Sequence, residues 1–245
     1  MSECSTMDMV LQRLLKYRHG LGLSQMDFSK CIGSSQTNYS DVERGNNIMS
    51  YRLLSGLYKY DYDIDYFFTG KHTVVEDSLL EKILRSCSES EAARLYNLII
   101  TGFMELWGED DNLVWNKCLF SELRAMSLLI MQKGDMDARL HYIRMFHGLS
   151  QKDLGNVMGV GRTKCGECEY GKKNIDADML LRLYNCGYAF PSFFFEDLVG
   201  IRSISFLLER DVDRKRRFYR YLENVLLYIM ENDSLLQIIR TSEVL

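Results

Sequence analysis

Residues 22–45 read GLSQMDFSKCIGSSQTNYSDVERG, and residues 148–171 read GLSQKDLGNVMGVGRTKCGECEYG. The second stretch follows the first at a distance of 126 positions. The same register extends outward in both directions and needs no gap over roughly 55 positions, which chance identity does not sustain. The pairs outside the two stretches include Leu14 with Leu140, Arg18 with Arg144, Leu54 with Leu180, Tyr58 with Tyr184, Phe67 with Phe193 and Phe68 with Phe194. The chain therefore contains one structural unit twice.

The first copy predicts five short helices. We expect Asp8 to cap the first helix, and Ser24 to cap a second that spans 25–31 and ends before Gly33. Ser34 or Ser35 starts a third helix, which turns Tyr39 and Val42 inward and ends at Gly45. A fourth helix is expected over 51–58 and a fifth over 63–68. Five short helices with a glycine between the second and the third are typical of a helix-turn-helix domain.

Composition predicts an all-α protein. The chain of 245 residues has a single proline and is 47% hydrophobic, as expected for long helices around packed cores. The first nine residues lack the basic and apolar regions of a signal peptide, and no apolar run is long enough to span a membrane. Seven scattered cysteines without such a signal indicate reduced thiols in a cytoplasm. No catalytic constellation, metal site or cofactor is expected.

The repeated motif resembles that of a known family. It runs Leu-Ser-Gln, then a small residue, then Gly, then a polar helix that ends in Glu-x-Gly, as in 23–45 and 149–171. This pattern is similar to the Cro/phage-repressor (xenobiotic-response-element) type of bacterial helix-turn-helix regulator. The resemblance covers about half of the chain, roughly 9–70 and 136–197. It implies two lambda-repressor-like five-helix domains and a cytoplasmic, nucleoid-associated transcriptional regulator, more often a repressor than an activator.

The resemblance places the third helix of one or both copies in the major groove of double-stranded DNA, and a copy that does not bind would serve only in packing. Gln36 suits adenine and Arg162 suits guanine, so the two copies would read different sequences. Gln25 and Gln151 would hold the DNA backbone. The residues expected at DNA are Gln25, Ser35, Gln36, Thr37, Asn38, Ser40 and Asn47 in the first copy, and Gln151, Gly161, Arg162, Thr163, Lys164, Lys172 and Lys173 in the second.

Some residues of the same helices are better explained by a structural role, and others count against DNA binding. By resemblance, Glu43 and Glu169 lie close to Arg18 and Arg144 in an ion pair that bridges two helices. Cys165 and Cys168 align with Tyr39 and Val42, so we expect core thiols; a redox-sensitive pair is the remaining alternative. The net charge of −4 and the carboxylates Asp41 and Glu167 count against DNA.

Helical extensions follow each copy, so we expect domains at 7–70 and 135–198 and extensions at 71–134 and 199–245. Predicted helices include one through Leu79 and Leu84, one over 89–107 and one over 115–131. They would pack against the neighbouring domain or form a homodimer. The basic run 214–217 would add phosphate contacts or lie on a solvated face. Two other functions stay open: an anti-repressor or antitoxin-like interaction module that does not touch DNA, and a small-molecule sensor.

Overall fold

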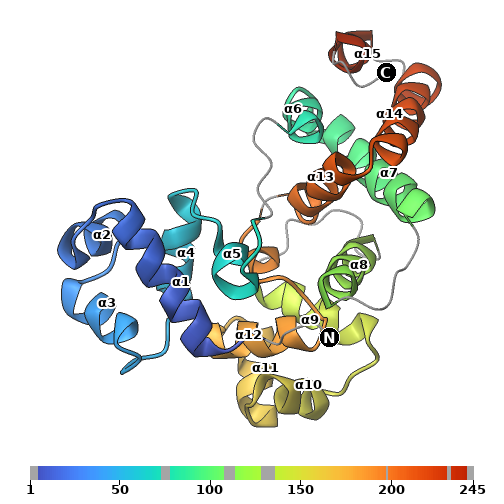
Figure 1. Cartoon of the computed structure of the whole chain (residues 1–245). Helices are drawn as coiled ribbons and strands as arrows, with labels where there is room; N and C mark the ends of the chain where they lie inside the picture. Colours follow the sequence, from blue (N-terminus) through green and yellow to red (C-terminus); the bar gives the residue numbers. More distant parts are fainter. Residues whose placement is uncertain are drawn as a thin grey trace. The chain divides into compact units, whose positions relative to one another are not determined.

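The computed structural model describes residues 5–72, 78–107, 114–127, 136–196, 198–230 and 233–241, and all regular elements within these ranges are helices (Figure 1). The prediction of an all-α protein is therefore confirmed for the described part of the chain. The scarcity of proline is a physical reason for this, because proline interrupts the interior of an α-helix and the chain has only one.

The first repeat contains five helices. Thr6 caps the first of them, accepting a hydrogen bond from the backbone N–H of Met9 at 3.4 Å. The prediction that Asp8 is this cap is wrong, because Asp8 lies inside the first turn, where a carboxylate instead complements the helix dipole. The remaining caps are Ser24, Ser35, Ser50 and Asp63, and the helices are α1 (Met7–Gly20), α2 (Gln25–Cys31), α3 (Gln36–Glu43), α4 (Tyr51–Lys59) and α5 (Ile64–Thr69).

The second repeat has four α-helices and a 3-10 helix. These are α9 (Met136–Phe146), α10 (Gln151–Met158), α11 (Arg162–Glu169), α12 (Ala177–Asn185) and the 3-10 helix η1 (Pro191–Phe194). The fifth element is thus shorter than its counterpart α5. Pro191 has no N–H to donate, and the N–H groups of Phe190 and Ser192 donate to the side chains of Glu122 and Asp65. These bonds hold the backbone of η1 from outside the helix.

The described residues group into two compact units. The first unit contains the described parts of Met1–Thr73, Asp111–Ala125 and Lys133–Asp197, and therefore both repeats. The second contains those of Val74–Asp110, Met126–Gln132 and Leu198–Leu245. This grouping cuts across the predicted extension 71–134, because α8 (Val114–Ser127) belongs mostly to the first unit. The predicted end of that helix, 128–131, lies outside the described residues.

Hydrogen bonds and ring contacts join the two repeats inside the first unit. The backbone N–H of Ala177 donates to the carbonyl of Met49 at 2.9 Å. The side chain of Asn185 exchanges two hydrogen bonds with the backbone of Ser5, at 2.9 and 3.1 Å. The ring of Phe195 stacks on Tyr51 with the centroids 4.9 Å apart. The ends of α4 and α12 therefore pair with segments of the opposite repeat.

Helix α8 covers the second repeat. The ring of Trp115 meets Phe190 edge-on at 5.0 Å, and Ser121 Oγ lies 2.7 Å from His147 Nε2. Glu122, which is 2% exposed, accepts the hydrogen bond from the N–H of Phe190. The predicted apolar face of this helix thus packs within the first unit.

The second unit consists of α6 (Leu79–Arg85), α7 (Glu89–Trp107), α13 (Ile201–Arg210), α14 (Val212–Val225), the π-helix η2 (Leu226–Met230) and α15 (Asp233–Thr241). Helices α7 and α14 pack closely because Gly102 leaves room for the ring of Tyr221. The hydroxyl of Tyr221 donates to the carbonyl of Leu98 at 3.0 Å. Within the described residues, no helix has the length and apolar character needed to cross a membrane.

Candidate nucleic-acid interface

A four-residue turn, 32–35, positions α3 against α2. Gly33 adopts a left-handed conformation with a φ of 65°, which glycine allows without strain. Tyr39 and Val42 are fully buried, as predicted, and the Tyr39 ring packs on Phe28 with the centroids 5.1 Å apart. The inner face of α3 is thereby fixed, and its other face is left to solvent.

An ion-pair network fixes the C-terminal end of α3 to α1 and α2. Glu43 accepts hydrogen bonds from Arg18 Nε at 2.6 Å, from Gln25 Nε2 at 2.6 Å and from the Tyr39 hydroxyl at 2.7 Å. The side chains of Arg18 and Glu43 are 9% and 3% exposed. The predicted ion pair is therefore confirmed, and its burial makes it a positional constraint on α3.

The second repeat builds a similar network without the tyrosine hydroxyl and with His141 Nδ1 at 3.9 Å from Glu169. Glu169 accepts from Arg144 Nε at 2.5 Å and from Gln151 Nε2 at 2.8 Å, which confirms the second predicted pair. Cys165 stands at the position that Tyr39 has in the first repeat, so no hydroxyl donates to Glu169 from there. In both repeats the glutamine amide predicted at the DNA backbone already donates within the chain, which sequence reasoning missed. A DNA contact of Gln25 or Gln151 remains a prediction. It would use the amide oxygen, or it would require the side chain to leave its glutamate.

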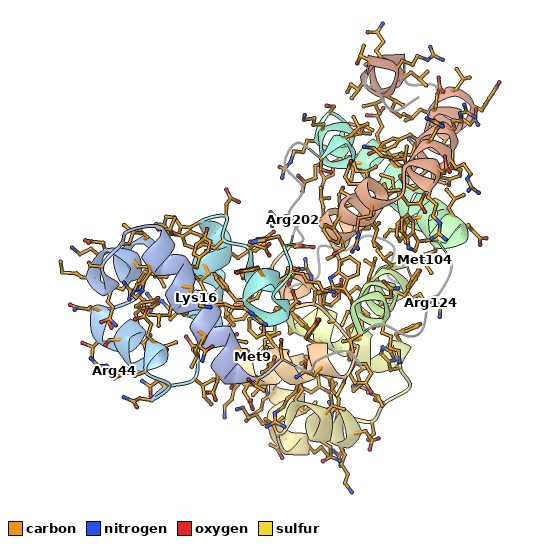
Figure 2. The ribbon with its side chains drawn as sticks, viewed as in Figure 1. Met9, Lys16, Arg44, Met104, Arg124 and Arg202 are labelled. Atoms are coloured by element: carbon orange, nitrogen blue, oxygen red, sulfur yellow. The ribbon has the colours of Figure 1, made fainter. Side chains whose placement is uncertain are left out.

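The N-terminal half of α3 presents most of the residues predicted for the first repeat. Ser35, Gln36, Thr37 and Asn38 are consecutive and exposed, and Asn47 is exposed beyond the helix. Ser40 differs, because it is only 7% exposed and lies on the side of α3 that packs. The Ser35 hydroxyl accepts from the N–H of Asn38 at 3.2 Å. Arg44, the C-cap of α3, is also exposed and is labelled in Figure 2.

In the second repeat, Gly161, Arg162 and Thr163 are exposed at the start of α11. Two of the predicted lysines have carboxylate neighbours: Lys164 Nζ lies 3.8 Å from Asp176, and Lys173 Nζ lies 3.1 Å from Glu167. The carboxylate of Glu167 is thus paired locally and does not stand as an unmatched negative charge on α11.

The exposed start of α3 and that of α11 each border a concavity lined in part by predicted residues. In the second repeat it is lined by Gln151, Arg162, Thr163, Gly166, Glu167, Tyr170 and Lys172. In the first repeat it is lined by Gly33, Ser34, Ser35, Asn38, Ser50, Arg52 and Leu53. Tyr170, which is 71% exposed, and Arg52 were missed by sequence reasoning. Two features of the sequence could have pointed to these residues. Tyr170 is an aromatic residue directly after a polar helix, and Arg52 lies in the first turn of α4.

Cys165 and Cys168 lie inside the second repeat. Both are fully buried, as their alignment with Tyr39 and Val42 predicted. Burial raises the pKa of the Cys165 thiol to about 11, which disfavours the reactive thiolate. No cluster of three metal-ligating side chains occurs among the residues that the structure describes. These cysteines act as small core residues on the inner face of α11.

Comparisons of the chain with protein-family models, with curated proteins and with solved structures give no match.

Proposed function

We propose that this chain is a sequence-specific DNA-binding transcriptional regulator, in which α3 and α11 are the reading helices of two helix-turn-helix domains. One observation carries the proposal: two repeats of the same element order each expose the polar start of their third helix, while an Arg–Glu pair and a half-buried Gln hold that helix against its neighbours. A reading helix must be rigid on its inner face and polar on its outer face to match base edges.

The chemistry of the two exposed surfaces differs. Gln36 is suited to a bidentate contact with adenine, and Arg162 to one with guanine, while Thr37 and Thr163 can contact thymine methyl groups or phosphates. Asn38, Asn47, Lys164, Lys172 and Lys173 would contact phosphates. Because both repeats belong to one compact unit, a single chain would grip two unequal half-sites. In this proposal the protein acts as a repressor and forms a homodimer through its helical extensions.

Selection from a random pool of double-stranded DNA at moderate salt tests this function directly. Enrichment of a motif with two unlike halves is the expected result. Failure to enrich any motif would contradict the proposal, provided that the protein used is folded by circular dichroism.

Arg162→Ala is expected to weaken binding to the selected duplex by about 1–3 kcal/mol and to relax the preference at one half-site. Arg162 is exposed and its loss removes a bidentate donor without opening a cavity. Binding is measured by fluorescence anisotropy on the selected duplex and on single-base variants. Lys59→Ala, which removes an exposed positive charge at the end of α4, is the matched control. Equally tight and equally selective binding by Arg162→Ala would rule out α11 as a reading helix.

A second candidate function is a protein-interaction module of the anti-repressor or antitoxin type, built on the same scaffold without DNA contact. The observation that favours it is the engagement of Gln25, Gln151, Lys164 and Lys173 with carboxylates of the chain itself, in a protein with a net charge of −4. A folded protein that enriches no DNA motif would support this second function.

A further inference from the structure

Helix α14 of the second unit has one buried face and one strongly basic face. Phe218, Leu222 and Val225 are buried, and the Phe218 ring lies 6.4 Å from that of Phe103 on α7. On the opposite side, three exposed arginines follow one another within about one helical turn. We call this set, Arg216, Arg217 and Arg220, the arginine face.

The acidic residues around α14 do not neutralise the arginine face. Lys215 pairs with Glu209 at 2.6 Å, Arg214 with Asp211 at 3.3 Å, and Arg240 with Glu223 at 2.8 Å. Arg217 and Arg220 have no ion pair among the described residues. In the described part of the chain, Arg216 has one ion pair, a 3.9 Å contact with Asp213, whose side chain is 80% exposed. The local carboxylates are therefore largely occupied by other basic side chains.

We propose that the arginine face binds the phosphate backbone of double-stranded DNA, a proposal that rests on the function proposed above. Guanidinium groups match phosphate oxygens with two parallel hydrogen bonds. Such contacts require no particular base, so the arginine face adds affinity and not sequence preference.

Duplex DNA fits this surface better than a lipid surface does. A helix that inserts into a membrane interface exposes an apolar face beside its basic one. The main apolar face of α14 is covered by α7, where the Tyr221 hydroxyl donates to the carbonyl of Leu98 and Gly102 admits the Tyr221 ring. Along the arginine face α14 exposes three guanidinium groups and the carboxylate of Asp213, a net positive charge that polyphosphate surfaces attract.

Two triple variants of the full chain test the proposal. The first, Arg216→Gln/Arg217→Gln/Arg220→Gln, removes the arginine face. The second, Lys82→Gln/Arg85→Gln/Arg94→Gln, removes the same charge from exposed positions on α6 and α7 of the same unit. The probes are the duplex recovered by selection, a mixed-sequence duplex with the same flanks, and phosphatidylserine-containing vesicles. Binding is measured across a series of salt concentrations.

The arginine-face variant is expected to bind both duplexes roughly 10- to 100-fold more weakly at physiological salt, with the slope of log K against log salt reduced by about 2–3. Its preference for the selected sequence should not change, and the control variant should bind like the wild type. If the arginine-face variant matches the control on DNA, this inference is overturned while the proposed function stands. A loss of vesicle binding alone would overturn it in favour of lipid. If folded wild-type protein binds neither duplex, the proposed function fails first and this inference falls with it.

Discussion

Glu43→Ala is expected to lower the free energy of unfolding of the first unit by about 3–5 kcal/mol, because it leaves the guanidinium of Arg18 buried without its counter-charge. The Arg18 side chain is only 9% exposed, and Glu43 accepts two of its hydrogen bonds, at 2.6 and 3.2 Å. The same change removes acceptors from Gln25 and Tyr39. Domains are commonly stable by only about 5–15 kcal/mol, so this is a large fraction of the total.

Urea denaturation followed by circular dichroism measures this loss. Glu169→Ala is the matched variant, and it should cost less, because Arg144 is 14% exposed and Glu169 has no tyrosine hydroxyl to accept from. The double variant Arg18→Met/Glu43→Ala should recover part of the loss, since the unpaired charge is gone. A double variant no more stable than Glu43→Ala would show that packing, and not the buried charge, sets the cost.

The pKa of Glu43 fixes how this contribution depends on pH. Burial acts to raise that pKa, but the hydrogen bonds from Arg18, Tyr39 and Gln25 together outweigh it and hold the pKa below its usual value. A lowered pKa means that the stabilisation is present above the unfolded-state pKa and is lost as pH falls through the folded-state pKa. Glu43→Ala should therefore lose less stability on acidification than the wild type does.

Asp65→Asn is expected to have the opposite effect and stabilise the protein at alkaline pH. Burial, and then the charges of Glu196 and Asp63, raise the pKa of Asp65 to about 7, despite hydrogen bonds from the N–H and hydroxyl of Ser192. Relative to an unfolded pKa of about 3.9, this shift corresponds to about 4 kcal/mol. The stabilisation is complete below the unfolded pKa and is lost as pH rises through about 7. Asparagine keeps an acceptor for Ser192 and carries no charge to desolvate.

The measurement is the urea midpoint, and the free energy of unfolding derived from it, at about pH 4, near the unfolded pKa, and at about pH 8, above the folded pKa. Asp65→Asn should match the wild type within about 1 kcal/mol at the lower pH and exceed it by about 2–4 kcal/mol at the higher. Asp213→Asn removes an 80% exposed carboxylate and should change neither midpoint. Equal destabilisation by Asp65→Asn at both pH values would show that the hydrogen bonds to Ser192 matter and the charge does not.

Asp65 belongs to a set of buried acidic groups in the first unit. Glu122 on α8 is 2% exposed and Glu196 is 5% exposed. Burial raises the pKa of Glu122, a rise that the charges of Glu196 and Asp65 reinforce while the hydrogen bond from Phe190 and the charge of Arg139 oppose it. Burial likewise raises the pKa of Cys118, one turn from Glu122 on α8. Burial thus raises the pKa values of acidic groups from the first repeat and from α8, and the hydrogen bonds of Asp65 to Ser192 make the Asp65→Asn experiment report on the junction between the repeats.

Local signals in the sequence were sufficient for the repeat and for most helix boundaries. The predicted ranges 25–31 and 89–107 coincide with α2 and α7. Serine caps, glycines that stop helices and apolar residues at helical spacing act within a few residues of one another, so they can be read without the fold. The ion pairs at Glu43 and Glu169 were predicted only through the resemblance, because their partners are 25 positions away.

The tertiary structure alone decided which side chains face outward and which meet across the chain. Ser40 is buried and Tyr170 exposed, and the amides of Gln25 and Gln151 point to carboxylates of their own repeats. Asp65 meets Ser192 across 127 positions. Such contacts leave no periodic trace, because burial and charge pairing depend on surfaces brought together only by folding. The sequence by itself thus determined two matched all-helical repeats, and the packed chain decided which of their polar residues stay exposed.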